Sequence, residues 1–201
     1  MLRVGLTGGL ASGKSFVGRA FEQLGCYLIR ADEIGHQVLA RGGDAYEPVV
    51  RAFGGGILDE AGEIDRKALA EIVFQNAERL TALNKIIHPL VIEEEERLMR
   101  LRESAEPSGI AMVEAAILIE TGSYRRLDRL IVVACPEWLQ IQRAMKRDGS
   151  TREQVESRLQ RQMPLSEKVK YADYVIDTSS TKEDTLRQTR QVFESLRSLQ
   201  T

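Results

Sequence analysis

The chain has 201 residues, of which 43% are hydrophobic and 29% are charged, and its formal net charge at pH 7 is −2. This composition favours one globular domain with room for a small insertion, and it lacks the basic excess that binding nucleic acid through bulk charge requires. The apolar strand that starts at Leu2, the lack of a long apolar span and the presence of only two cysteines, Cys26 and Cys135, predict a cytoplasmic protein with reduced thiols and no membrane association.

Short apolar runs rich in β-branched residues predict the strands. Four clear runs are Val4–Leu6, part of Ile110–Ile119, Leu130–Ala134 and Tyr174–Ile176. A fifth, weaker run is Cys26–Ile29. Helical patterns separate them, and this alternation favours an α/β fold with a five-stranded, mostly parallel sheet. From Glu33 to Arg102 the pattern is almost entirely helical, which is too long for one crossover and predicts a helical, substrate-binding insertion.

Three helix starts can be placed from local signals. Ser150 with Glu153 predicts a capping box, and Thr181 with Asp184 predicts a weaker one. Pro136 suits the first turn of a helix that runs to about residue 147.

The segment Gly8–Ser15 matches the phosphate-loop pattern G-x-x-x-x-G-K-[ST] at every fixed position. An apolar strand precedes it and a helix-forming stretch, Phe16–Leu24, follows, as that motif requires. Its backbone N–H groups are expected to cradle phosphate oxygens, with Lys14 reaching the β- and γ-phosphates and the Ser15 hydroxyl coordinating Mg²⁺. The expected nucleotide-binding residues here are Gly9, Ala11, Ser12, Gly13, Lys14, Ser15 and Phe16.

The loop alone does not separate kinases from GTPases or motor ATPases. A GTPase needs an Asn-Lys-x-Asp element for guanine, and Asn84-Lys85-Ile86-Ile87 lacks the aspartate and continues as a helix. A kinase needs a base near its acceptor and cations around the transferred phosphoryl group.

Asp32 is the candidate base. It follows the predicted strand Cys26–Ile29, and ligands of open α/β sheets bind at the carboxyl ends of strands. Asp32 could accept a hydroxyl proton there and help to hold the metal. A helix N-cap, which aspartate also favours at such a boundary, explains the residue equally well from spacing alone.

Arginines at helical spacing are the candidate cations. Gln140, Arg143 and Arg147 share one helix face, and a second group, Arg158, Arg161 and Gln162, follows the polar turn Asp148–Thr151. Two arginine-bearing helices joined by such a turn predict a lid that closes over ATP, with Arg143 and Arg147 as the stronger candidates. Ordinary surface arginines are the alternative for at least half of this set.

These residues closely resemble the dephospho-CoA kinase family along nearly the whole chain. The phosphate loop is common to many families, whereas the His-Pro element and the arginine–glutamine stretch are more specific. The resemblance rests on Leu6–Gly9 with Ser12–Ser15, Ala31–Ile34 with His36, Gly62–Arg66, Leu83–Pro89, Gln140-x-x-Arg143-x-x-x-Arg147-Asp148, Gln162–Leu165 with Lys168, and Ala172–Ile176.

The resemblance implies a three-layer P-loop kinase fold that uses ATP and Mg²⁺ to phosphorylate the ribose 3′-hydroxyl of dephospho-CoA, the last step of coenzyme A biosynthesis. It implies one domain spanning 1–201, with a core at about 1–32, 108–140 and 170–201, a CoA-side helical insertion at about 33–107 and a lid at about 141–169. We expect a monomer whose ligands are dephospho-CoA and ATP. Asp32, Lys14 and Arg143 match catalytic positions, Ser15 and Asp32 hold the metal, Arg147 lies on the ATP side, and Asp32, Arg66, Asn84 and His88 contact the acceptor.

Three positions depart from the family pattern. Phe16 stands where Thr is usual, Glu114–Glu120 lacks the proline of Asp-x-Pro-Leu-Leu-Phe-Glu, and Asp177-Thr178-Ser179 replaces an Asp-Asn-x turn. Two rival functions stay open: a P-loop kinase for a nucleoside or another small alcohol, and a nucleotide-controlled switch that regulates a partner.

Overall fold

A computed structural model describes residues 1–200, apart from the side chains of Phe74 and Gln75. The chain divides into two compact units, which we call the core unit (residues 1–29 and the chain from residue 101 onward) and the helical unit (residues 30–100). In the described part of the chain, no helix combines the length and the apolar character needed to cross a membrane.

A five-stranded sheet organises the core unit. Its strands are β1 (Leu2–Gly8), β2 (Tyr27–Arg30), β3 (Ile110–Glu114), β4 (Arg129–Ala134) and β5 (Tyr174–Asp177), in the order β2-β3-β1-β4-β5. β1 pairs in parallel with β3 and β4, and β4 pairs in parallel with β5. Buried apolar side chains follow one another along β3 and β4, as expected for strands covered on both faces. The α/β fold with five strands is therefore confirmed.

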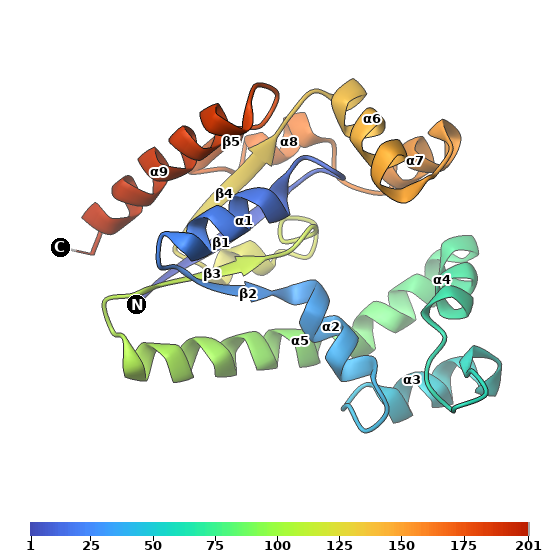
Figure 1. The fold of residues 1–201 in the computed structure, drawn as a ribbon. Coiled ribbons are helices and arrows are strands. Elements are labelled where there is room, and N and C mark those ends of the chain that lie inside the picture. The colour runs from blue at the N-terminus through green and yellow to red at the C-terminus, as the bar shows by residue number, and fades with distance from the viewer. Residues whose placement is uncertain (201) are drawn as a thin grey trace. The chain divides into compact units, whose positions relative to one another are not determined.

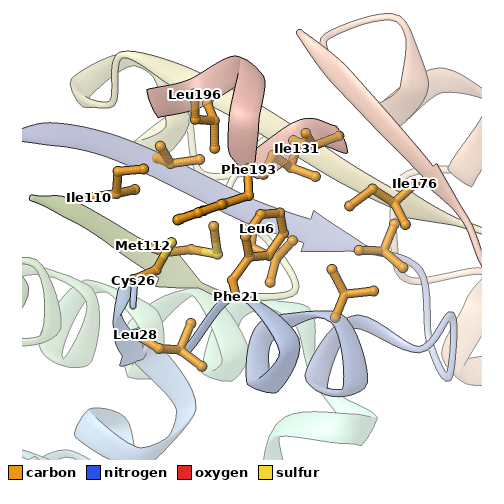
Figure 2. Packing of buried hydrophobic residues seen from close by; sticks show 14 residues of the cluster. Leu6, Phe21, Cys26, Leu28, Ile110, Met112, Ile131, Ile176, Phe193 and Leu196 are labelled. Carbon is orange, nitrogen blue, oxygen red and sulfur yellow. The ribbon is translucent and has the colours of Figure 1, made fainter. Parts of the chain in front are cut away.

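Helices α1 (Lys14–Gln23) and α9 (Lys182–Ser198) lie together against the sheet (Figure 1). Their buried aromatic side chains, Phe21 and Phe193, meet Leu6 and Met112 of the strands in one apolar cluster (Figure 2). This cluster fixes β1 and α1, the two elements that carry the phosphate loop. The remaining helices of the core unit are η2 (Ser123–Arg126), α6 (Glu137–Asp148), α7 (Arg152–Leu159) and α8 (Leu165–Val169).

One predicted helix cap is confirmed and another is wrong by one residue. The Thr181 side chain accepts a hydrogen bond from the Asp184 N–H at the start of α9. The capping box of α7 is formed by Thr151 with Gln154, and not by Ser150 with Glu153. Gly149 ends α6 with φ 65°, so Ser150 belongs to the linker, and glutamine at the third helical position closes the box as well as glutamate does.

The helical unit has a core of its own. It contains α2 (Ala31–Leu39), α3 (Tyr46–Phe53), η1 (Gly55–Ile57), α4 (Arg66–Gln75) and most of α5 (Ala77–Ala105), which continues into the core unit. Val49, Ile57, Leu69 and Leu83 are buried in one cluster within this unit. The helical character expected for residues 33–102 is confirmed.

Candidate active site

The phosphate loop runs from the end of β1 into the start of α1. Gly13 precedes α1 with φ 93° and no side-chain cap, which leaves the N–H groups of Lys14 and Ser15 for another acceptor, whereas the Phe16 N–H donates to the Gly13 carbonyl. Ala11 has φ 53°, a left-handed conformation that side chains other than glycine seldom adopt. Such strain is characteristic of functional loops, and here it belongs to a curl of backbone suited to anions.

Gly8 has no room for a side chain. A Cβ at this position would lie 2.5 Å from the backbone oxygen of Val133 and 2.6 Å from Ser12 Oγ. We expect Gly8→Ala to lower the free energy of unfolding by about 1–3 kcal/mol, because the strand carbonyl cannot move aside. Gly35→Ala is the control, since nothing lies within 4 Å of its Cβ position in α2, and it should raise stability by about 0.5–1 kcal/mol. Urea denaturation measures both, and equal effects would contradict the packing shown here.

A buried carboxylate, Glu114 at the end of β3, lies beside the loop. Its Oε1 accepts a 2.7 Å hydrogen bond from Ser15 Oγ and lies 3.3 Å from Lys14 Nζ. Its Oε2 is buried and has no hydrogen-bond partner in the described part of the chain. Gly18 of α1 makes room for it, since a Cβ there would lie 2.8 Å from Glu114 Oε2. The site therefore holds a hydroxyl and an unused carboxylate oxygen, both hard oxygen ligands, at the same place.

Lys168 of α8 connects the loop to its surroundings from inside the protein. Its side chain is fully buried. Its Nζ donates to the carbonyl of Ala116 at 2.7 Å, lies 3.5 Å from the carbonyl of Gly8 and pairs with Glu120 Oε1 at 2.9 Å. Glu120 Oε1 also accepts the Met163 N–H. One ammonium group thus holds together the phosphate loop, the segment after β3 and the segment before α8.

The first arginine group lies on α6, as predicted. Gln140 is buried, and its Nε2 donates to the carbonyl of Cys135. Arg143 donates two hydrogen bonds to Thr178, which follows β5. Ile141 and Ala144 of the same helix pack against Leu10 and Ala11 of the phosphate loop. Helix α6 is therefore in direct contact with the loop.

Asp148 gathers two further arginines at the turn between α6 and α7. Its carboxylate accepts hydrogen bonds from Arg147 at 2.6 and 3.0 Å and from Arg158 at 2.7 Å. The hydrogen bonds from Arg147, which have the larger effect, and from Arg158 hold the pKa of Asp148 far below its usual range. The predicted polar turn between two arginine-bearing helices is present.

The pKa of Asp148 gives the sign of a pH-dependent effect. A carboxyl group whose pKa is depressed by folding contributes its full stability above the unfolded pKa of about 3.9 and loses it as the pH falls below that value. We expect Asp148→Asn to cost about 1 kcal/mol of unfolding free energy at pH 7, because solvent screens this surface network. The difference from wild type should shrink below pH 4 in denaturation curves. Glu156→Gln, which breaks only the exposed pair with Arg152, is the control; a cost no larger than the control's would contradict the bridging role.

The remaining predicted residues lie in the helical unit. Asp32 lies in the first turn of α2 and is exposed; the N-cap of that helix is Arg30, so the capping interpretation of Asp32 is wrong. Arg66 begins α4 after Asp65, which caps that helix with its side chain. Asn84 and His88 lie one turn apart on α5 and are half-buried, and burial lowers the pKa of His88, which favours the neutral ring.

Three residues of the core site were not predicted as functional from sequence: Glu114, Lys168 and Thr178. Glu114 carried a usable signal, because an acidic residue at the carboxyl end of the apolar strand Ile110–Val113 is expected to face a ligand. Thr178 carried a form of the same signal, because it directly follows the strand Tyr174–Asp177, and Lys168 carried none beyond its place in the family pattern. In the described part of the chain, no group of three or more His, Cys, Asp or Glu side chains is arranged to hold a metal ion.

A phosphate loop after the central strand of this sheet, with arginines on the helix that follows β4, places the chain in the class of P-loop kinases. A family model described as dephospho-CoA kinase matches residues 2–184. The dephospho-CoA kinase of Aquifex aeolicus is 44% identical over 196 residues, covering 98% of each chain. The chain therefore belongs to the dephospho-CoA kinase family.

Solved structures are similar over nearly the full length. The protein TT1252 from Thermus thermophilus has a TM-score of 0.82 and 31% identity, covering 96% of each chain. The dephospho-CoA kinase from Campylobacter jejuni has a TM-score of 0.73 and 28% identity, covering 99% of this chain and 98% of its own. The two proteins differ from this chain at most positions, so the likeness lies chiefly in the fold.

Proposed function

We propose that this chain transfers the γ-phosphoryl group of ATP to the ribose 3′-hydroxyl of dephospho-CoA, giving CoA and ADP. The observation that carries the proposal is the convergence of Lys14 and Ser15 of the phosphate loop on the buried carboxylate of Glu114, in a chain of this family. The loop supplies the phosphate site, and the family membership supplies the acceptor.

Mg²⁺ fits the residues present. Mg²⁺ takes one or two protein oxygens and keeps waters and substrate phosphates as its other ligands. Ser15 Oγ is one candidate ligand, and the unpartnered Oε2 of Glu114 suits a ligand or an acceptor for metal-bound water. When bound, the ion neutralises charge on the phosphates. Asp32 is the second proposed metal residue.

Each of the proposed site residues has its own role in the phosphoryl transfer. The loop N–H groups bind phosphate oxygens, and Lys14 adds a cation for the β- and γ-phosphates. Asp32 receives the proton of the attacking hydroxyl. Arg143 and Arg147 of α6 are the proposed lid arginines that counter charge on the moving phosphoryl group.

The acceptor side is proposed to involve Arg66, Asn84 and His88. A guanidinium, a carboxamide and a neutral imidazole together offer hydrogen bonds to phosphate, ribose and amide groups, all of which dephospho-CoA contains. The division into a core, a CoA-side insertion and a lid belongs to the same proposal. The monomeric state, the cytoplasmic location and the lack of nucleic-acid or membrane partners stay predictions.

The test compares acceptors. Purified chain is incubated with Mg²⁺ and ATP, and ADP release is measured with dephospho-CoA, adenosine, shikimate, gluconate or water as acceptor. Dephospho-CoA should give ADP far faster than water and the other alcohols. Faster ADP release with another alcohol would favour the rival small-alcohol kinase, and slow release with every acceptor would favour a nucleotide-controlled switch.

A further inference from the structure

Thr178, in the turn after β5, joins helix α6 to the phosphate loop. Its side chain is buried, with 5% of the residue exposed. Thr178 Oγ1 donates a 2.6 Å hydrogen bond to the carbonyl of Ser12 and accepts one of 3.0 Å from Arg143 Nη1. Arg143 Nη2 donates a second bond, of 2.7 Å, to the Thr178 carbonyl. The Thr178 N–H donates to the carbonyl of Ala134, which holds the turn at the end of the sheet.

The proton of the Thr178 hydroxyl has a defined direction. A guanidinium has only donors, so the hydroxyl must accept from Arg143 and is left with its single proton for another acceptor. The Ser12 carbonyl at 2.6 Å is much nearer than the Ala134 carbonyl at 3.4 Å. The bonds therefore run in one order, from Arg143 to Thr178 to Ser12, and each donor polarises the next.

The bond to Ser12 sets the orientation of a phosphate-binding group. Ser12 C=O and Gly13 N–H belong to one planar, trans peptide unit, so they point in opposite directions. Because the carbonyl points to Thr178, the Gly13 N–H points away from it. Gly13 has φ 93°, and a Cβ there would lie 3.3 Å from the Thr178 methyl carbon, so this peptide is tightly fitted to Thr178.

We propose that Thr178 is a positioning residue for the nucleotide site: its hydroxyl, held by Arg143, turns the Ser12–Gly13 peptide so that the Gly13 N–H is presented to a phosphate of the bound nucleotide. Arg143 then acts on the nucleotide through Thr178, in addition to any charge that it places near the phosphates. The inference rests on nucleotide binding by the loop and is independent of the acceptor.

The test uses two substitutions that separate the hydroxyl from the methyl group. Thr178→Val keeps the shape and removes the hydroxyl, and Thr178→Ser keeps the hydroxyl and removes the methyl. Thr189→Val is the matched control, because Thr189 is fully buried and its hydroxyl donates only within α9, to the Thr185 carbonyl. Calorimetric titration with ADP and Mg²⁺ gives the dissociation constants, and thermal unfolding reports stability.

Thr178→Val should bind ADP about tenfold more weakly, the scale of one lost hydrogen bond at a buried group. Thr178→Ser should stay within about threefold of wild type, and Thr189→Val should bind ADP as wild type does while losing similar stability. ADP binding by Thr178→Val within twofold of wild type, or an equal loss in Thr178→Ser, would overturn the proposal. Failure of wild type to phosphorylate dephospho-CoA would affect only the proposed function.

Arg143→Ala supplies the second measurement and suffices if Thr178→Val does not fold. It should also weaken ADP binding, because the freed hydroxyl can rotate toward the Ala134 carbonyl. The double variant should lose less ADP affinity than the product of the two single losses, because the two substitutions remove one shared effect. Unchanged ADP affinity in Arg143→Ala, or losses that multiply in the double variant, would show that Thr178 does not carry the effect of Arg143.

Discussion

Asp32→Asn is expected to bind ATP as wild type does and to lose about 10²–10⁴-fold of its turnover, the contribution typical of a positioned general base. Asparagine keeps the size and the hydrogen-bonding oxygen of the side chain, but it cannot take the proton of the acceptor hydroxyl. Turnover with saturating ATP and dephospho-CoA is measured beside nucleotide affinity. Glu33→Gln is the control, because Glu33 is the other acidic residue in the first turn of α2. Its Oε1 lies 3.8 Å from Arg30 Nε, and it has no proposed part in the chemistry.

The two roles proposed for Asp32 can be separated in the same experiment. If Asp32 mainly holds the metal, raising the Mg²⁺ concentration should restore turnover of Asp32→Asn. If it is the base, excess Mg²⁺ should leave the defect in place. Near-full turnover at ordinary Mg²⁺ would remove Asp32 from both roles and leave it as an exposed residue in the first turn of α2.

Lys168→Met is expected to lower the free energy of unfolding by about 2–3 kcal/mol, because it removes a fully buried charged donor whose ion-pair partner, Glu120, reaches solvent. Its ammonium group is fully buried and bonded to the Ala116 carbonyl and Glu120, and methionine leaves these acceptors only the uncharged donors Thr7 Oγ1 and Met163 N–H. Chemical denaturation measures the loss. Lys170→Met is the control two residues away, where the ion pair with Glu167 is exposed and its loss should cost at most about 1 kcal/mol.

A second substitution identifies the cause of that loss. Glu120→Gln added to Lys168→Met should recover part of the stability, because it removes the carboxylate that was left without a cation. A loss in Lys168→Met no larger than that in Lys170→Met would show that the bonds of the buried Lys168 ammonium contribute little to stability. No recovery in the double variant would assign the loss to packing and to the carbonyl bonds.

The order of elements and the phosphate loop could be predicted because their signals are local. The strands are continuous apolar runs, and the loop motif fixes glycine, lysine and serine at set spacings. The α7 cap failed by one residue because Ser150 and Thr151 are adjacent capping residues, and only the left-handed turn at Gly149 decides between them. Short-range sequence signals therefore predict whether a segment is a helix or a strand more reliably than they predict the residue at which it starts or ends.

The contacts that Lys168 and Thr178 make with the phosphate loop and its surroundings could not be predicted, because they join segments that are far apart in the sequence. Lys168 lies in Leu165–Lys170, a stretch with exposed charged neighbours, and its burial follows only from the packing of α8. Thr178 is a departure from the family pattern in sequence, and its link to Ser12, 166 residues away, exists only in the fold. Asp32, in contrast, was singled out from the sequence alone. Its position in α2 excludes the helix-cap interpretation, and its role as base stays a prediction.

The position of the new phosphate on the acceptor tests the proposed reaction most directly. Dephospho-CoA, ATP and Mg²⁺ are incubated with the purified chain, and the product is examined by two-dimensional proton–phosphorus NMR. We expect one new phosphate ester whose phosphorus couples to the ribose 3′ proton, in an amount equal to the ADP formed. Formation of ADP without a new phosphate ester on dephospho-CoA would contradict the proposed reaction. A new phosphate ester that couples to a proton other than the ribose 3′ proton would also contradict it.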